Sequence, residues 1–329
     1  MLRPLLILTL LASSRPVFAQ QESGDSTIRT NVPLVLAPVT VSDRKGNFID
    51  GLTVDDFALT DDGIPQKLRL DTSDTVLAPV SLVVLIQSSG ISTPEMARIS
   101  RVGSLIKPLL IGEVGRAAVL SFDTETRVFQ EFTGDSGKIS AAFQNIDTRT
   151  IKDAKLIDAV AEAVKMLDTR PPNSRRILLI LSESRDRGSK MKLADAVELA
   201  QRAGVVIYPE TYSAQASAIT SKPENNPPMP APAGANVDIG AALEEFGRLG
   251  KSNAADALAR ATGGRHLGFL TQQSLEKVLE RTGEEIHSQY LLSFVPMQTK
   301  NTGFHVIKVA VKSHPEAEVR VRPGYWPQK

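Results

Sequence analysis

The segment from Val80 to Ser92, VSLVVLIQSSGIS, most constrains the fold of this chain of 329 residues. It begins with an almost unbroken apolar run, and the polar residues 87–90 follow directly. A continuous apolar run ended by small polar residues is typical of a central parallel strand that is buried on both faces. In open α/β folds, ligands bind at the edge of the sheet where such strands end. We therefore expect the loop after this strand to carry the function.

From Pro79 onward, the pattern alternates between strands and helices. Strands are expected at 81–86, 116–122, 126–132, 177–181 and 205–208, and helices at 157–167, 193–200, 253–262 and 271–285. A further helix is expected to run from Ser92 toward Ile106, because Ser92 and Glu95 have the spacing of a capping box. This alternation predicts an α/β fold with a doubly wound, mostly parallel sheet.

Both ends of the chain carry strand and turn signals instead. Strands are expected at 35–41 and 66–70, and again at 290–295, 304–311 and 319–321. The pair Asp61 and Asp62 lacks the spacing of a calcium-binding loop and is interpreted as part of a turn. The early β unit alone is too small to be stable. We therefore expect a small β-sandwich-like domain made of residues 31–77 plus 288–327, with the α/β domain, residues 78–287, inserted between its halves.

The start of the chain predicts export. Residues 1–19 combine Arg3, a short apolar stretch and the small-residue cleavage site Val17-Phe18-Ala19, as in a secretory signal peptide. The apolar stretch is shorter than the roughly 20 residues that a membrane span needs. We expect residues 20–30 to form a disordered linker and the Pro-rich residues 214–240 a mobile loop. The protein is therefore expected to be periplasmic or extracellular, without stable membrane insertion after signal cleavage.

Composition and motifs argue against several classes of function. The chain has 38 Lys and Arg against 37 Asp and Glu, and this net charge of +1 gives no electrostatic basis for binding nucleic acid. No dinucleotide-binding glycine pattern and no Gly-x-Ser-x-Gly elbow is present. His305 shares an alternating face with Ile307 and Val309 and is interpreted as a structural residue. We expect no enzyme, with a hydrolase as a remote alternative.

The order of motifs along the chain resembles that of exported bacterial proteins of the acidobacterial type that contain a von Willebrand factor type A domain. The matching segments are 39–46 (VTVSDRKG), 52–57 (LTVDDF), 62–63 (DG), 261–265 (ATGGR), 289–292 (QYLL) and 321–326 (VRPGYW). They cover nearly all of the chain that follows the signal peptide. The resemblance implies a Rossmann-like sheet and a binding function rather than catalysis.

Type A domains at large carry a metal-ion-dependent adhesion site, built from an Asp-x-Ser-x-Ser loop, a Thr and a later Asp. Its divalent cation takes an acidic group from a partner. By resemblance, the loop positions here are Gln87, Ser89 and Ile91. The Thr position is Ala154, and the later Asp position is Glu183. Because one carboxylate and two hydroxyls are lost, few oxygen ligands remain for Mg²⁺, and the resemblance implies a degenerate metal site.

We expect a protein partner to bind, without a cofactor, at a rim formed by Gln87, Ser88, Ser89, Ile91, Ala154, Lys155, Glu183 and Arg185. Lys155 and Arg185 can supply positive charge in place of a metal, or pair with Glu183. The amide of Gln87 can orient a carboxylate of the partner. The alternative is an adhesion module that depends on Mg²⁺ or another divalent cation, held by Ser89, Glu183 and Asp186.

Overall fold

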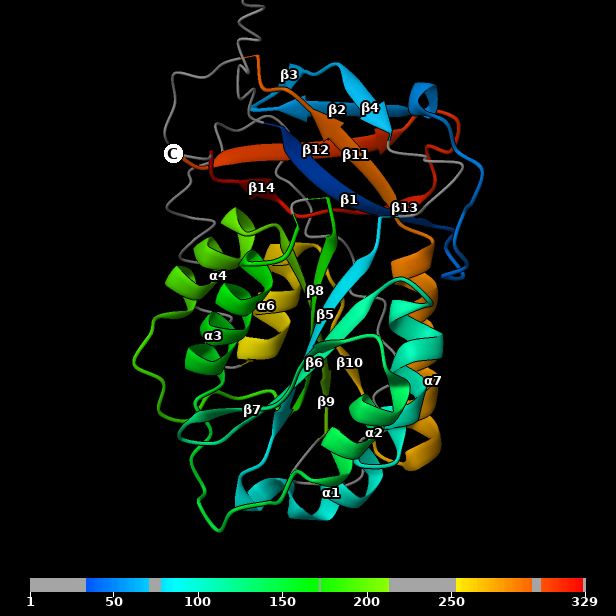
Figure 1. The fold of residues 1–329 in the computed structure, drawn as a ribbon. Coiled ribbons are helices and arrows are strands. Elements are labelled where there is room, and N and C mark those ends of the chain that lie inside the picture. The colour runs from blue at the N-terminus through cyan, green and yellow to red at the C-terminus, as the bar shows by residue number, and fades with distance from the viewer. Residues whose placement is uncertain (1–33, 71–77, 172, 213–252, 298–302, 328–329) are drawn as a thin grey trace, which may run out of the picture. The chain divides into compact units, whose positions relative to one another are not determined.

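A computed structural model describes residues 34–70, 78–171, 173–212, 253–297 and 303–327 (Figure 1). The expected signal peptide, the linker at 20–30 and the Pro-rich loop at 214–240 lie outside the described residues. Within the described ranges, no helix combines the length and the apolar character needed to cross a membrane.

A six-stranded sheet of order β10-β9-β8-β5-β6-β7 forms the centre of the α/β part (Figure 1). Its strands are β5 (Val80–Gln87), β6 (Arg116–Phe122), β7 (Thr126–Thr133), β8 (Arg175–Ser182), β9 (Val205–Thr211) and β10 (Leu267–Gly268). All neighbours are parallel except the edge strand β7, which is antiparallel to β6. Counted along the chain, the order is that of a doubly wound sheet, with the first strand, β5, in the middle. The predicted fold class is confirmed.

Helices cover both faces of this sheet (Figure 1). Helices α3 (Leu156–Asp168), α4 (Leu193–Arg202) and α6 (Ala254–Thr262) pack on one face, and α1 (Thr93–Ile99), α2 (Ser136–Gln144) and α7 (Gln272–His287) pack on the other. Successive residues of β5 alternate between the two cores: Val83 and Leu85 lie in the first, and Leu82, Val84 and Ile86 in the second. The continuous apolar run is therefore explained by burial on both faces.

Strands from the two ends of the chain pair with each other. One four-stranded antiparallel sheet contains β13 (Glu318–Arg320), β1 (Val35–Ser42), β11 (Tyr290–Phe294) and β4 (Leu68–Leu70). A second contains β14 (Gly324–Tyr325), β12 (His305–Val311), β2 (Phe57–Asp61) and β3 (Ile64–Pro65). Val39 and Phe294 from the first sheet share one buried cluster with Leu59 and Ile307 from the second. The two sheets thus form the sandwich, while its exact boundaries at 31–77 and 288–327 stay a prediction.

The helix after β5 is shorter than expected. After α1, the chain continues as short 3-10 and π-helical segments between residues 102 and 111. The Ser92 side chain forms no cap, and its hydroxyl instead accepts a hydrogen bond of 2.7 Å from the Tyr212 hydroxyl. Gly103 lies so close to α2 that a Cβ there would be 2.9 Å from the Phe143 ring. Tertiary packing against α2 and Tyr212 therefore outweighs the local helix signal.

The buried centre of the sheet generates the first prediction. Leu85 is fully buried, whereas Val128 on the edge strand β7 is 51% exposed. Leu85→Ala should lower the free energy of unfolding by about 2–5 kcal/mol, because it leaves a cavity in the core. The matched truncation Val128→Ala should change it by less than about 0.5 kcal/mol. Urea denaturation followed by circular dichroism measures both, and similar losses for the two variants would contradict the assigned position of β5.

Candidate functional site

The loop after β5 is bound to two neighbouring segments by backbone hydrogen bonds. The Ser88 N–H donates to the Phe122 carbonyl at the end of β6, at 2.8 Å. The Arg149 N–H donates to the Ser88 carbonyl at 2.9 Å, and the Gly90 N–H donates to the Ile151 carbonyl at 2.7 Å. The carboxyl ends of β5 and β6 and the segment before α3 therefore meet at one rim of the sheet, as expected for parallel strands.

The side-chain amide of Gln87 connects the loop after β5 with the loop after β8. Its Nε2 donates to the Ser89 hydroxyl at 2.8 Å, and its Oε1 accepts from the Glu183 backbone N–H at 2.9 Å. Gln87 is 1% exposed, and Ser89 is fully buried. The amide is thus used inside the protein, and burial leaves it without the access to a partner's carboxylate that we had expected.

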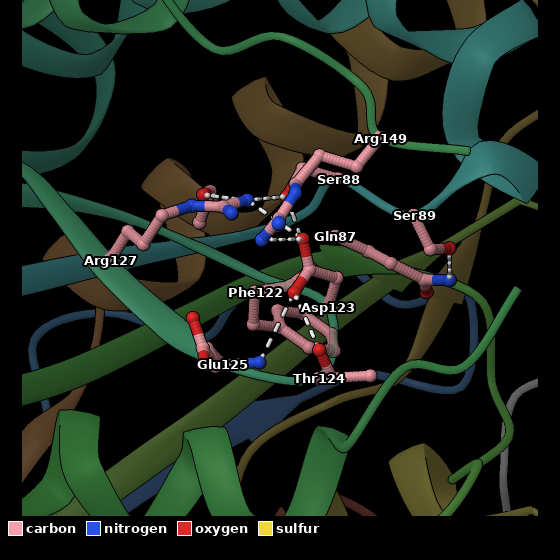
Figure 2. A network of polar contacts seen from close by, with 10 residues as sticks. Gln87, Ser88, Ser89, Phe122, Asp123, Thr124, Glu125, Arg127 and Arg149 are labelled. Atoms are coloured by element: carbon pink, nitrogen blue, oxygen red, sulfur yellow. Dashed lines mark hydrogen bonds and ion pairs between the residues drawn. The ribbon is translucent and has the colours of Figure 1, made fainter. Parts of the chain in front are cut away.

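A buried carboxylate at the end of β6 is paired with two arginines (Figure 2). Asp123 Oδ2 lies 2.9 Å from Arg127 Nη2 and 3.6 Å from Arg149 Nη1. Burial by itself would raise the pKa of Asp123, but the Glu125 backbone N–H and the Arg127 guanidinium outweigh it, and the pKa is lowered. The ionised carboxylate is therefore neutralised by cations of the chain itself.

Glu183, at the end of β8, has an arginine partner of the same kind. Its side chain is 8% exposed, and Oε2 accepts a hydrogen bond from Arg187 Nε at 3.1 Å. Pairing of Glu183 with Lys155 or Arg185 was one of two roles considered for these cations, but the partner of Glu183 is Arg187, four residues later. Arg185 is exposed, and the Lys155 backbone N–H donates to the Asp123 carbonyl at 2.7 Å.

Asp186 and Ala154 hold the loop after β8 against the start of α3. Asp186 Oδ1 accepts hydrogen bonds from the Ile157 backbone N–H at 3.1 Å and from the Ser189 hydroxyl. Its carboxylate therefore satisfies an N–H of the first turn of α3, where negative charge is favourable. Ala154 is buried, and its backbone exchanges two hydrogen bonds with Arg187.

The expected rim residues differ in burial. The buried ones are Gln87, Ser88, Ser89, Ala154 and Glu183; Ile91 and Lys155 are half-buried, and Arg185 is exposed. Asp123, Arg127, Arg149 and Arg187 were not predicted as site residues from the sequence. The sequence did contain one signal for these pairs. Directly after β6 and after β8 there is a carboxylate, and an arginine follows it four residues later. That the listed residues bind a partner stays a prediction.

The bridge made by Gln87 is testable by substitution. Gln87→Leu leaves the Ser89 hydroxyl and the Glu183 N–H without their partner, at a cost of about 1–3 kcal/mol for each buried group. The free energy of unfolding should therefore fall by about 2–6 kcal/mol, the sum for the two groups, in urea denaturation. Gln130→Leu is the matched control, since the Gln130 side chain makes only an exposed contact with a backbone carbonyl. Equal effects of the two substitutions would show that the amide does not hold the two loops together.

The lowered pKa of Asp123 predicts a pH dependence of stability. Because the folded-state pKa lies below the unfolded value of about 4, ionised Asp123 stabilises the fold above that pH. This contribution is lost as the pH falls through the folded-state pKa. Asp123→Asn should therefore be less stable than the unaltered chain at pH 7, and the difference should shrink below about pH 4. Chemical denaturation at several pH values measures this, with the exposed Asp147→Asn as control. A difference that stays constant with pH would contradict the assignment.

No family model and no curated protein matches the chain. Among solved structures, it is similar to the conserved hypothetical protein BatB from Bacteroides thetaiotaomicron (12% identity, TM-score 0.41, 62% of this chain and 99% of that one). It is also similar to a von Willebrand factor type A protein from Catenulispora acidiphila, with 12% identity and a TM-score of 0.46. That match covers 78% of this chain and 51% of the other chain. A third similar structure is that of an aerotolerance-related membrane protein from Bacteroides fragilis, with 14% identity and a TM-score of 0.43. That match covers 63% of this chain and 98% of the other chain.

These likenesses concern the fold alone and say nothing about the rim. The sheet of this chain has the doubly wound order with an antiparallel edge strand next to β6. The α/β part of the chain therefore has a doubly wound, mostly parallel fold, as the resemblance of the sequence motifs to those of von Willebrand factor type A proteins implies.

Proposed function

We propose that this chain is an exported, non-catalytic protein-interaction module that binds an acidic surface of a partner protein at the rim without a bound metal. The rim here means the carboxyl ends of β5, β6 and β8 with the segment before α3. The observation that carries the proposal is the pairing of the buried carboxylates Asp123 and Glu183 with arginines. Guanidinium groups of the chain itself therefore supply the positive charge that balances these carboxylates.

The arginines Arg149 and Arg187 reach solvent, unlike the carboxylates Asp123 and Glu183 with which they pair. The side chains of Arg149 and Arg187 are 46% and 38% exposed, whereas Asp123 is fully buried. Arg185 is exposed as well, and Lys155 is half-buried. A guanidinium that is already oriented by a buried carboxylate still has N–H donors for a second acceptor. Such groups favour a carboxylate of the partner, because charge-assisted hydrogen bonds are the stronger ones.

The alternative, a site for Mg²⁺ or another divalent cation, would need groups that already have partners. The Ser89 hydroxyl accepts from Gln87, Glu183 accepts from Arg187, and Asp186 accepts from the start of α3. An ion would have to break these contacts and compete with a guanidinium. A hydrolase is less favoured still, because the Ser88 and Ser89 hydroxyls contact Arg127 and Gln87, and neither residue is a general base.

Calorimetric titration of Mg²⁺ tests the absence of a metal requirement at the rim. Titration into the chelator-treated chain should give no saturable heat that depends on Glu183. Glu183→Gln removes one of the two carboxylates, Glu183 and Asp186, of the alternative ligand set, and the exposed Glu125→Gln is its control. A micromolar signal that Glu183→Gln abolishes and Glu125→Gln preserves would replace the proposal with the cation-dependent alternative.

Charge reversal tests the binding surface itself. In capture from an envelope extract, the double variant Arg149→Glu with Arg185→Glu should retain at least tenfold less of any partner than the unaltered chain. Lys308→Glu with Lys312→Glu, which reverses two exposed charges on and beside β12, should retain as much partner as the unaltered chain. Chelator should have no effect. Equal capture by both double variants would place binding elsewhere, and loss of capture with chelator would show a metal requirement.

A further inference from the structure

Three ionisable side chains gather in the β-sandwich, far along the chain from the rim segments. Asp61 ends β2, Asp62 begins the turn to β3, and His305 opens β12, the antiparallel neighbour of β2. His305 Nδ1 lies 3.4 Å from Asp61 Oδ1 and 3.0 Å from Asp62 Oδ2. One ligand atom from each of the three residues lies within 4.8 Å of the others.

The hairpin turn holds Asp62 in one orientation. Asp62 has a φ of 48° and Gly63 a φ of 82°, as a type I′ turn between two antiparallel strands requires. The Asp62 N–H donates to the Val306 carbonyl at 2.9 Å, and the Val306 N–H donates to Asp62 Oδ1 at 2.9 Å. These bonds use one oxygen of the carboxylate. The other oxygen, Oδ2, is the one beside His305.

Asp61 contributes a buried carboxylate oxygen that accepts no hydrogen bond from the described residues. Asp61 is 4% exposed, and its Oδ2 accepts from the Tyr325 hydroxyl at 2.9 Å, whereas Oδ1 accepts none. The Tyr325 ring stacks on the His305 ring, with centroids 5.1 Å apart. Within the described part of the chain, no lysine or arginine forms an ion pair with Asp61 or Asp62. Unlike the rim, this cluster therefore has carboxylates without a guanidinium partner.

We propose that Asp61 Oδ1, Asp62 Oδ2 and His305 Nδ1 bind a divalent transition-metal ion of the zinc class. In a tetrahedral site with bonds of about 2.1 Å, neighbouring ligand atoms are roughly 3.4 Å apart. The two measured separations, 3.0 and 3.4 Å, are close to that value. An imidazole nitrogen favours Zn²⁺ over Mg²⁺ and Ca²⁺, which prefer oxygen ligands throughout.

The surroundings suit an ion that ties the β2–β3 turn to β12 and keeps one position open. The Asp62 side chain is 41% exposed, so the cluster has a route from solvent, while the side chains of Asp61 and His305 are only 5% and 3% exposed. The fourth position then falls to water or to a group from outside the chain. A protonated His305 between the two carboxylates would make the same contacts without a metal, and it is the outcome that the experiment must separate from the proposal.

The test is titration of Zn²⁺ and of Co²⁺ into the full chain, without an affinity tag and after chelator treatment. We expect one saturable site, a higher melting temperature with Zn²⁺, and visible absorption of Co²⁺ that reports coordination by the protein. Asp61→Asn and His305→Asn should each weaken binding at least 100-fold. His314→Asn is the matched control, because His314 also lies 3.4 Å from a carboxylate oxygen, that of Glu316, but is 41% exposed. The chain has four histidines and no cysteine, so few other sites compete.

Absence of saturable Zn²⁺ and Co²⁺ binding to the unaltered chain would overturn the proposal and leave the protonated histidine as the explanation. Binding that survives in both Asp61→Asn and His305→Asn would overturn it too, because the ion would then lie elsewhere. Circular dichroism shows whether each variant folds. If a variant does not fold, the Co²⁺ spectrum of the unaltered chain still tests whether the protein binds the ion. Glu183→Gln should leave Zn²⁺ binding unchanged, so the result is independent of the function proposed for the rim.

Discussion

Burial of β5 on both faces sets the geometry of the rim. All eight of its residues are buried, and β6 and β8 pair with it on either side. A strand in this position brings its polar loop between the ends of its two neighbours. Gln87 is the last residue of the strand and is buried with it, so its amide must find partners within the protein. It finds them in Ser89 and Glu183, and the two loops become one unit.

Buried carboxylates impose the same electrostatic requirement in two places. An ionised carboxylate removed from water needs a counter-charge or hydrogen bonds. At the rim, Arg127 and Arg187 meet this requirement from within the chain, four residues after Asp123 and Glu183. In the sandwich, Asp61 meets a tyrosine hydroxyl and an imidazole instead. The difference explains why we assign a metal to the sandwich rather than to the loop that resembles a metal site.

More of the fold than of the candidate site could be predicted from the sequence. The strands at 116–122 and 126–132 and the helix at 157–167 were predictable, because their apolar spacing is a property of nearby residues. The two-residue strands β10 and β14 carry too short a pattern for such a signal. The early end of α1 was also beyond prediction, since the segment after it packs closely against α2, where Gly103 lies beside Phe143, 40 residues away.

Local patterns were therefore enough for the α/β class and for the positions of the longer strands. Which charges meet was set by the folded chain alone. Asp61 and His305 belong to opposite ends of the sequence and come together only because β2 pairs with β12. Periodicity acts between residues close in sequence, whereas ion pairing and burial depend on distance in space. For that reason the arginine partners at the rim and the histidine beside Asp61 became visible only in three dimensions.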